Sequence, residues 1–323
     1  MTPAAGEPSP AWDVVGVGAN SVDLVNVLPA TPDPRVAALA KLRVRRQVVC
    51  CGGQVATAMA TCAALGLRAK YVGATGSDEN GRLVRQALSE RAIDVSDVVT
   101  REGRNQFAVI LLDERTGERI VLWDRDDRLA LREAELPAGA LAAAKVVHVD
   151  DVDEDTAIRA ARIGRDAGRV VTSDLDRLTG RTEELVAAVT VPIFAEHLPP
   201  ELTGEPDQER ALRKLRRRHD GLLVVTLGPD GAMALDGDAL HHVPAYEVDA
   251  VDTTGSGDVF RGGFIAGLLR GWPVDEVLRF ANAAAAVSCT RLGALNGVPA
   301  PGEVSRLVGR GTLRAAPGGR GGG

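Results

Sequence analysis

The sequence predicts an α/β protein: an open, mostly parallel β-sheet flanked by helices on both faces, with a small β lid. Three observations lead to this prediction. Short β-branched runs alternate with Ala- and Leu-rich stretches of helix length, two further strand-like runs are separated only by a polar turn, and 45% of the 323 residues are hydrophobic. A chain of this length and composition can bury one large core.

The alternation begins with a strand expected over 13–18 and a helix expected over 54–65. Further core strands are expected at 69–73, 146–149, 170–174, 191–194 and 222–226. The spacers are long enough for helices, which crossovers between parallel strands require. Strands rich in Val and Ile are typical of a sheet that is covered on both faces.

One segment interrupts this alternation. The runs 107–112 and 119–123 are strand-like, and a polar turn that contains Gly117 joins them, so they are expected to form a β-hairpin. Residues 21–27 are also strand-like and follow the first core strand directly. We expect these runs to form a small sheet over the mouth of the main domain, a lid that takes in about 20–45 and 105–126.

A single domain is expected over 12–316, because no internal repeat is visible. The ends, 1–11 and 317–323, have the Pro- and Gly-rich composition of disordered tails. The exposed strands of a lid sheet are convenient edges for pairing with a second copy, so a homodimer is expected.

Charge and composition exclude several classes of partner. A net charge of −6 gives no electrostatic signature of nucleic-acid binding, although it leaves room for a local basic groove, and no apolar run approaches the roughly 20 residues that a membrane span needs. The start of the chain does not resemble a secretion signal. The four cysteines, Cys50, Cys51, Cys62 and Cys289, match neither a metal site nor a disulfide scaffold. A cytoplasmic protein without nucleic-acid or membrane partners is expected.

The segment 252–258, Asp-Thr-Thr-Gly-Ser-Gly-Asp, leads from a strand-like stretch into a helix. Gly255 and Gly257 lack Cβ atoms, so the backbone can approach a ligand closely, and the N–H groups and positive dipole end of the helix point toward it. These features predict an anion hole for a phosphoryl group. Asp258 lies in the first turn, where the dipole favours an ionised carboxylate, and we expect it to accept a proton from an attacking hydroxyl at neutral pH.

An acidic residue at a helix start is by itself more often a helix-terminal carboxylate than a catalytic base. The adjacent glycines and the second acid, Asp252, favour catalysis here. No Lys follows the glycines, so a lysine-assisted phosphate loop is excluded, and a divalent cation, normally Mg²⁺, is expected to neutralise the phosphates.

The segment 252–258 closely resembles the C-terminal signature of the ribokinase-like (PfkB) carbohydrate kinases. The likeness continues in order along the chain at 14–23, 51–66, 71–81 and 226–231, so it covers roughly 13–301. It implies a ribokinase-like fold and an ATP-dependent phosphotransferase that uses Mg²⁺ and acts on an alcohol group of a sugar or sugar acid.

The resemblance also implies roles for individual residues. Asp258 is the implied base, and the anion hole is supplied by Gly255, Ser256 and Gly257. The acceptor's hydroxyls are held by Asp23 with Gly52 and Gly53. ATP is bordered by Thr226, Gly228, Gly231 and Asn282. A monovalent cation such as K⁺ is implied beside the loop, at Asp252 and Thr254.

Two departures from the family pattern affect these roles. Thr57 stands where many members have Asn, and Gln54 replaces a common Lys or Asn, so the acceptor contacts differ and ribose itself becomes a weaker expectation. The Asn of a common Asn-x-x-Glu motif is absent before Glu196. Either Glu196 takes part of that motif's role near the metal, or phosphates and water alone hold the metal.

Two other functions remain open. A nucleoside kinase of the same superfamily needs aromatic side chains in the acceptor pocket, and the chain has only five Phe, three Trp and two Tyr. Its candidates are Tyr71, Phe107 and Trp123. A non-catalytic, ligand-sensing relative is the third hypothesis, but a sensor has no need of the intact Asp258 and glycine loop.

Overall fold

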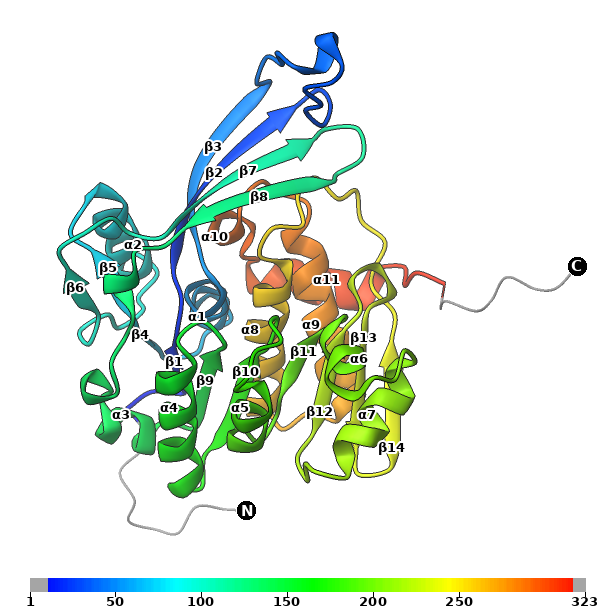
Figure 1. The fold of residues 1–323 in the computed structure, drawn as a ribbon. Helices are drawn as coiled ribbons and strands as arrows, with labels where there is room; N and C mark the ends of the chain where they lie inside the picture. Colours follow the sequence, from blue (N-terminus) through cyan, green and yellow to red (C-terminus); the bar gives the residue numbers. More distant parts are fainter. Residues whose placement is uncertain (1–10, 316–323) are drawn as a thin grey trace, which may run out of the picture.

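The computed structural model describes residues 11–315, in which helices cover both faces of a central sheet (Figure 1). One parallel sheet has the strand order β10-β9-β1-β4, and a second has the order β11-β12-β13-β14. Two bridges, Thr172–Val191 and Leu175–Phe194, join β10 to the β11 segment, so the two sheets lie side by side. The open, mostly parallel core predicted from the sequence is confirmed.

The core strands lie close to their expected positions. Their bounds are β1 Val14–Val17, β4 Ala69–Val72, β9 Val146–Asp150, β10 Val170–Asp174, β11 Ile193–Ala195 and β12 Leu223–Thr226. Two more strands, β13 Ala232–Asp236 and β14 Ala239–Val243, form an antiparallel hairpin at one edge. The alternation of the sequence did not identify this hairpin.

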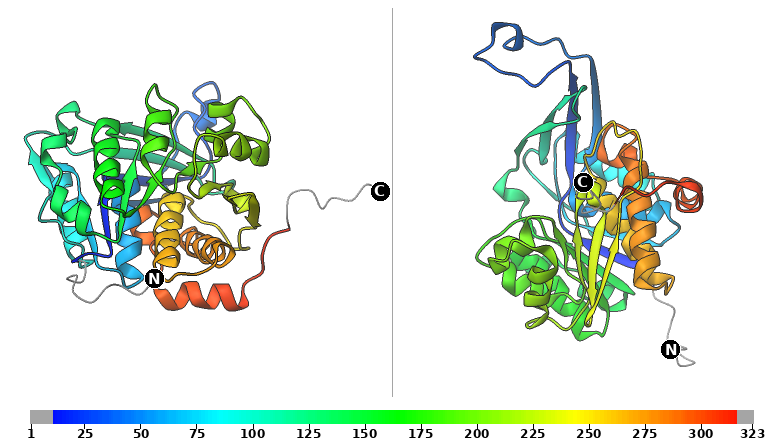
Figure 2. Two further views of the ribbon diagram at one scale, coloured as in Figure 1. Left: turned by 90° about the horizontal axis from the view of Figure 1, so that it is seen from below. Right: turned by 90° about the vertical axis from the view of Figure 1, so that its right-hand side faces the viewer.

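Alternate residues of the strands pack against different helix layers. Val14 on β1 packs with Val55 and Met59 of α1 (Gln54–Ala64), whereas Val15 packs with Ile158 of α4 (Glu154–Asp166). This two-sided burial explains why the strands are rich in β-branched residues. Figure 2 (left) separates the two layers: the green helices lie on one side of the sheet and the orange ones on the other.

The remaining helices complete these layers. Their bounds are α2 Glu79–Ser89, α3 Ala138–Ala143, α5 Thr182–Ala188, α6 Leu198–Thr203, α7 Gln208–Arg216, α8 Ser256–Leu269, α9 Val274–Ser288, α10 Ala294–Gly297 and α11 Pro301–Arg310. Within residues 11–315, no helix is both long and apolar enough to cross a membrane.

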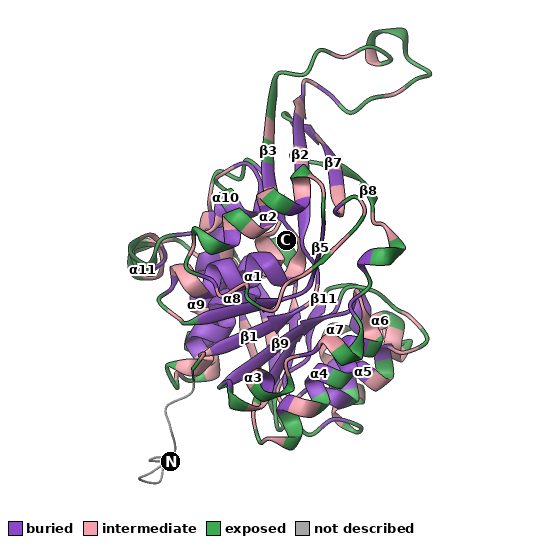
Figure 3. Ribbon diagram, turned by 90° about the vertical axis from the view of Figure 1, so that its left-hand side faces the viewer, coloured by how far each residue is buried: buried purple, intermediate pink, exposed green. Residues whose placement is uncertain are grey.

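The lid sheet has the strand order β3-β2-β7-β8 and rises from one edge of the main sheet (Figures 1 and 2). Its strands are β2 Ser21–Leu28, β3 Arg46–Gly52, β7 Phe107–Asp113 and β8 Arg119–Asp124, and a two-stranded sheet of β5 Ala74–Gly76 and β6 Val99–Arg101 lies beside it. The expected hairpin is therefore present as β7 and β8. All six residues of β8 are exposed, whereas the core strands are buried (Figure 3). Of the two expected tails, 1–10 and 316–323 lie outside the described residues.

Candidate active site

The candidate site lies at the carboxyl edge of the parallel strands, below the lid sheet. The chain leaves β1 at this edge and continues into β2 of the lid, while β9 and β10 end there in Asp150 and Asp174. The N-terminus of α8 points to the same edge. Ligands of open α/β sheets bind at this end of the strands, because the loops there can surround them.

The loop before α8 has the geometry of an anion hole. Gly255 adopts a left-handed conformation with φ 76°, and the helix begins with the next residue. Within residues 11–315, no acceptor takes the backbone N–H of Gly257 or Asp258, so both point free from the helix start. The Asp252 carboxylate fixes the loop by accepting the N–H of Thr254 and that of Gly293, each at 2.9 Å.

Asp258 is half-buried in the first turn of α8, beside these N–H groups. Desolvation raises the pKa of its carboxyl well above the usual range, and the negative charge of Asp174 raises it further. Burial and the neighbouring carboxylate therefore oppose the helix dipole, which was expected to favour the ionised form of Asp258.

Arg261, one turn further along α8, compensates part of this charge. Its Nη2 lies 2.7 Å from Oδ1 of Asp174, and both side chains are buried. No role was expected for Arg261 or Asp174. Two signals in the sequence point to them: Arg261 is the only charged residue of α8 after its first turn, and Asp174 ends a core strand at the edge where ligands bind.

On the lid side, Asp23 projects from β2 and is almost fully buried. Its Oδ1 accepts a hydrogen bond from Ser21 Oγ at 2.6 Å, and burial raises its pKa to about 6. Gly52 lies opposite Ser21 on β3, where an added Cβ would collide with the Asp23 carboxylate. Gly53 has φ 97°, and a Cβ there would collide with the chain at Asn20. The negative charge of Asp23 also raises the pKa of Asp258.

Thr57 sits in the second turn of α1 and is fully buried. Its Oγ1 has no hydrogen-bond partner among the described residues. The structure places this hydroxyl inside the protein, not on an open wall of the acceptor site.

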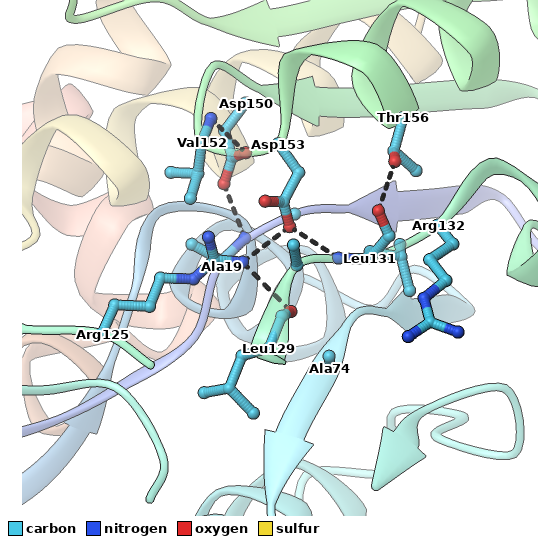
Figure 4. Close-up of polar contacts among 12 residues, drawn as sticks. Ala19, Ala74, Arg125, Leu129, Leu131, Arg132, Asp150, Val152, Asp153 and Thr156 are labelled. Atoms are coloured by element: carbon cyan, nitrogen blue, oxygen red, sulfur yellow. Dashed lines mark hydrogen bonds and ion pairs between the residues drawn. The ribbon is translucent and has the colours of Figure 1, made fainter. Parts of the chain in front are cut away.

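Buried hydrogen bonds fix the chain where β1 passes into the lid. Tyr71 Oη donates to the carbonyl of Gly18 at 2.7 Å and accepts from Asn20 at 2.8 Å, and Tyr71 is fully buried. Asp150 accepts the N–H of Ala19 at 2.6 Å (Figure 4). Tyr71 is thus committed to the protein and is not free to stack on a ligand.

Figure 4 also shows the contacts that anchor the segment after the lid hairpin. Asp153 Oδ2 accepts from Arg125 Nη2 at 2.7 Å and from the N–H of Leu131 at 3.1 Å. Arg125 also donates to the carbonyl of Leu129. These contacts hold the end of the lid sheet against the loop after β9.

Of the residues expected on the nucleotide side, Thr226, Gly228 and Gly231 lie at the end of β12 and in the turn that follows it. Thr226 ends β12, and its hydroxyl donates to the Phe194 carbonyl at 3.3 Å. Gly228 and Gly231 both have positive φ, 54° and 92°, and a Cβ on Gly231 would collide with the Val243 carbonyl.

Asn282 on α9 contacts the backbone of the segment 243–244. Its Nδ2 donates to the carbonyl of Val243 at 2.8 Å and to that of Pro244 at 3.3 Å. Since Asn282 is almost fully buried, its amide supports the segment from behind.

The three residues expected near metal ions occupy two places. Glu196 is exposed just after β11, whereas Asp252 and Thr254 lie in the anion loop. Thr254 Oγ1 is buried without a hydrogen-bond partner among the described residues, whereas the backbone N–H of Thr254 donates to the Asp252 carboxylate. Within the described part of the chain, no three His, Cys, Asp or Glu side chains are grouped as a metal site.

The lid sheet reaches the anion loop directly. Arg119, the first residue of β8, donates a hydrogen bond to the hydroxyl of Thr253. In the register of β7 and β8, Trp123 pairs with Ala108, which in turn pairs with Asp23 on β2. Paired residues share one face of a sheet, so Trp123 and Asp23 face the same side, and Trp123 is 61% exposed. Phe107 has the opposite parity and faces the other way.

Comparisons with known proteins show the family and the fold of the chain. The family described as pfkB family carbohydrate kinase matches residues 19–301. An ATP-dependent ribose-1-phosphate kinase of Halopiger xanaduensis is 32% identical over 264 residues, which are 81% of this chain and 87% of that protein. A nucleoside kinase of Methanothermobacter thermautotrophicus is 27% identical over 90% of this chain and 94% of its own. The crystal structure of a ribokinase from Thermotoga maritima superposes with a TM-score of 0.79, 24% identity and coverage of 93% of this chain and 100% of its own.

Proposed function

The chain belongs to the pfkB family of carbohydrate kinases, and on that premise we propose that Asp258 takes the proton from a sugar hydroxyl while the loop at 255–257 holds the γ-phosphoryl group of ATP. The protein is an ATP-dependent carbohydrate kinase, a phosphotransferase with an alcohol group as acceptor. One observation carries the assignment of the base: Asp258 is the carboxylate next to the free N–H groups of the helix start.

The acceptor that the site fits best is a sugar or sugar acid. Asp23, Gly52 and Gly53 form a small polar wall within electrostatic reach of Asp258, which suits the hydroxyls of a compact ligand. Thr57 would add a hydrogen bond only if the acceptor reaches its buried hydroxyl. Residues 12–316 are proposed to act as one kinase domain in which the lid closes over this ligand.

A nucleoside is the second candidate acceptor, and a specific observation favours it. Of the three aromatic candidates, Tyr71 is buried and Phe107 faces away, but Trp123 is exposed on the side of Asp23. An exposed indole there can stack on a flat base. Trp123 alone offers one stacking surface, and a nucleobase is commonly held between two apolar groups, so a sugar remains the favoured acceptor.

ATP is proposed to bind across the loop at 255–257 and the turn formed by Thr226, Gly228 and Gly231, with Asn282 supporting the wall of the site. When bound with ATP, Mg²⁺ would supply positive charge that offsets the charge of the phosphates during transfer. Since no group of three ligating side chains lies among the described residues, we propose that phosphates and water hold it, with the exposed Glu196 as the protein candidate.

A monovalent cation such as K⁺ is proposed at Asp252 and Thr254. The unpaired, buried Thr254 Oγ1 beside a carboxylate fits such an ion, because a buried hydroxyl without a partner is otherwise costly. When bound, the cation would add positive charge next to the anion hole. The chain's own contribution is to hold the loop in shape through Asp252 and Gly293.

We propose a homodimer that covers the outer face of the lid sheet. Leu24, Val49, Val109 and Leu122 pair in register across the four strands on the face opposite Asp23, and Val49 and Leu122 are 54% and 55% exposed. A second copy would remove this apolar stripe from water. A cytoplasmic location is also proposed, since the enzyme uses ATP and its four cysteines are unpaired.

The test is ADP release from Mg-ATP over a panel of ketoses, aldoses, sugar acids, sugar phosphates and nucleosides. Asp258→Asn should lower turnover 10²- to 10⁴-fold on the acceptor that responds, while ATP still binds. Turnover retained by Asp258→Asn would refute the base. No turnover on any acceptor, with ATP bound, would favour the ligand-sensing relative.

A further inference from the structure

A buried ion pair lies directly beneath Asp258. Asp174 ends β10 and Arg261 lies one turn along α8 from Asp258, and Nη2 of Arg261 is 2.7 Å from Oδ1 of Asp174. Their side chains are 3% and 4% exposed. Arg261 also approaches the carbonyl of Ile193 at 3.4 Å. Desolvating two charges costs about as much as their attraction returns, so such a pair is weak evidence for a stabilising role and invites a functional explanation.

The base belongs to the same cluster. Asp258 lies one helical turn before Arg261, so the two side chains are neighbours on α8, and Asp174 Oδ2 is buried without a hydrogen-bond partner among the described residues. Burial and the negative charge of Asp174 both raise the pKa of Asp258. Two acids and one guanidinium therefore form one buried cluster.

The titratable groups around this cluster are neutral or negative, so Arg261 supplies the positive charge that offsets the carboxylates. His148 on β9 bonds to Thr172 through Nδ1 at 2.9 Å, and burial lowers its pKa to about 3, so it stays neutral. Asp23 on the lid, Asp151 after β9 and Asp176 after β10 add negative charge.

We propose that Asp174 and Arg261 are positioning residues that set the pH range in which Asp258 works as the base. The inference rests on the proposed function. In the transfer step the acceptor O–H bond breaks, its proton goes to a carboxylate oxygen of Asp258, and its electron pair forms the bond to the γ-phosphorus as ADP leaves. The protonated, neutral Asp258 then lies next to the ion pair of Asp174 and Arg261.

The two partners have opposite effects on Asp258. The negative charge of Asp174 raises the pKa of Asp258 and the positive charge of Arg261 lowers it. Turnover needs ionised Asp258, so it falls as pH drops below that pKa. Asp174→Asn should move the acidic limb of kcat/KM to lower pH, and Arg261→Gln should move it to higher pH, each by about one pH unit or more. A merely structural role would lower activity without moving the limb in opposite directions.

The experiment is the pH profile of kcat/KM for wild type and both variants. Asp176→Asn is the matched control: it removes an exposed carboxylate two residues away and should shift the limb far less. Arg261→Lys keeps the charge and should return the limb toward wild type. If a single variant does not fold, Asp174→Asn/Arg261→Gln removes one charge of each sign and should place the limb between those expected for the single variants.

The outcomes separate this inference from the function beneath it. If the acidic limbs of both variants stay at the wild-type pH or move in the same direction, and Asp258→Asn is inactive, the inference is overturned. The assignment of Asp258 as the base would then still stand. Activity in Asp258→Asn would overturn the proposed function itself.

Discussion

Gly255→Ala tests whether the exact shape of the anion loop limits turnover. Gly255 has φ 76°, a conformation that side chains disfavour, and the loop bends there to start α8. A Cβ at this position would lie 2.6 Å from Cβ and 2.9 Å from Cα of Ala294. Contacts under 3.0 Å force one of the two segments to move.

The Gly255→Ala substitution has two effects, one on stability and one on turnover. Holding Ala in the left-handed region costs about 1–2 kcal/mol. Ala294 cannot simply yield, because it begins α10 and the preceding Gly293 is bound to Asp252 at 2.9 Å. The loop itself therefore shifts by a few tenths of an ångström, and its N–H groups no longer point at the transferring phosphoryl group. Loss of one such donor typically costs about 10²- to 10³-fold in kcat.

The assay is kcat for ADP release with the acceptor identified by the panel, together with the midpoint of thermal unfolding. Gly204→Ala is the matched control, since Gly204 has φ 67° but a Cβ there meets nothing within 4 Å. It should lose comparable stability and keep its turnover. Gly255→Ala/Ala294→Gly removes one of the colliding atoms and should regain part of kcat. Turnover of Gly255→Ala within about threefold of Gly204→Ala would refute this reasoning.

Three further predictions concern the lid and the cation. Arg119→Gln loses the hydrogen bond to the anion loop and should raise KM for the acceptor about tenfold. The control Arg115→Gln, on the same hairpin, should not change KM. Equal KM values for the two variants would show that the lid does not contribute to acceptor binding through this bond. Thr254→Val should abolish stimulation of turnover by KCl over choline chloride without lowering the unfolding midpoint, since the buried hydroxyl is unpaired; stimulation that persists would rule out this cation site. Leu122→Arg should convert a dimer to monomer in sedimentation at micromolar concentration, and a monomeric wild type would exclude the dimer.

The fold class and the anion loop were readable from the sequence because both are encoded locally. A run of β-branched residues forms a strand wherever it is buried on both faces, and two glycines before a helix leave its N–H groups open. The positions of β1, β9, β10 and the lid hairpin followed from such patterns. The hairpin of β13 and β14 was missed, because antiparallel strands at the edge of a parallel sheet break the alternation that identified the others.

The charge state of the base depends on neighbours that the sequence does not place. Asp174 and Arg261 meet only after β10 and α8 have packed together, and burial there raises the pKa of Asp258. The same holds for Tyr71, which packing commits to Gly18, and for Trp123, which the strand register turns toward Asp23. The sequence by itself determined which chemistry this protein carries, since backbone shape and residue type are local. Only the tertiary structure decided how its charges are tuned, because a pKa reflects every group brought within a few ångströms, whatever its distance along the chain.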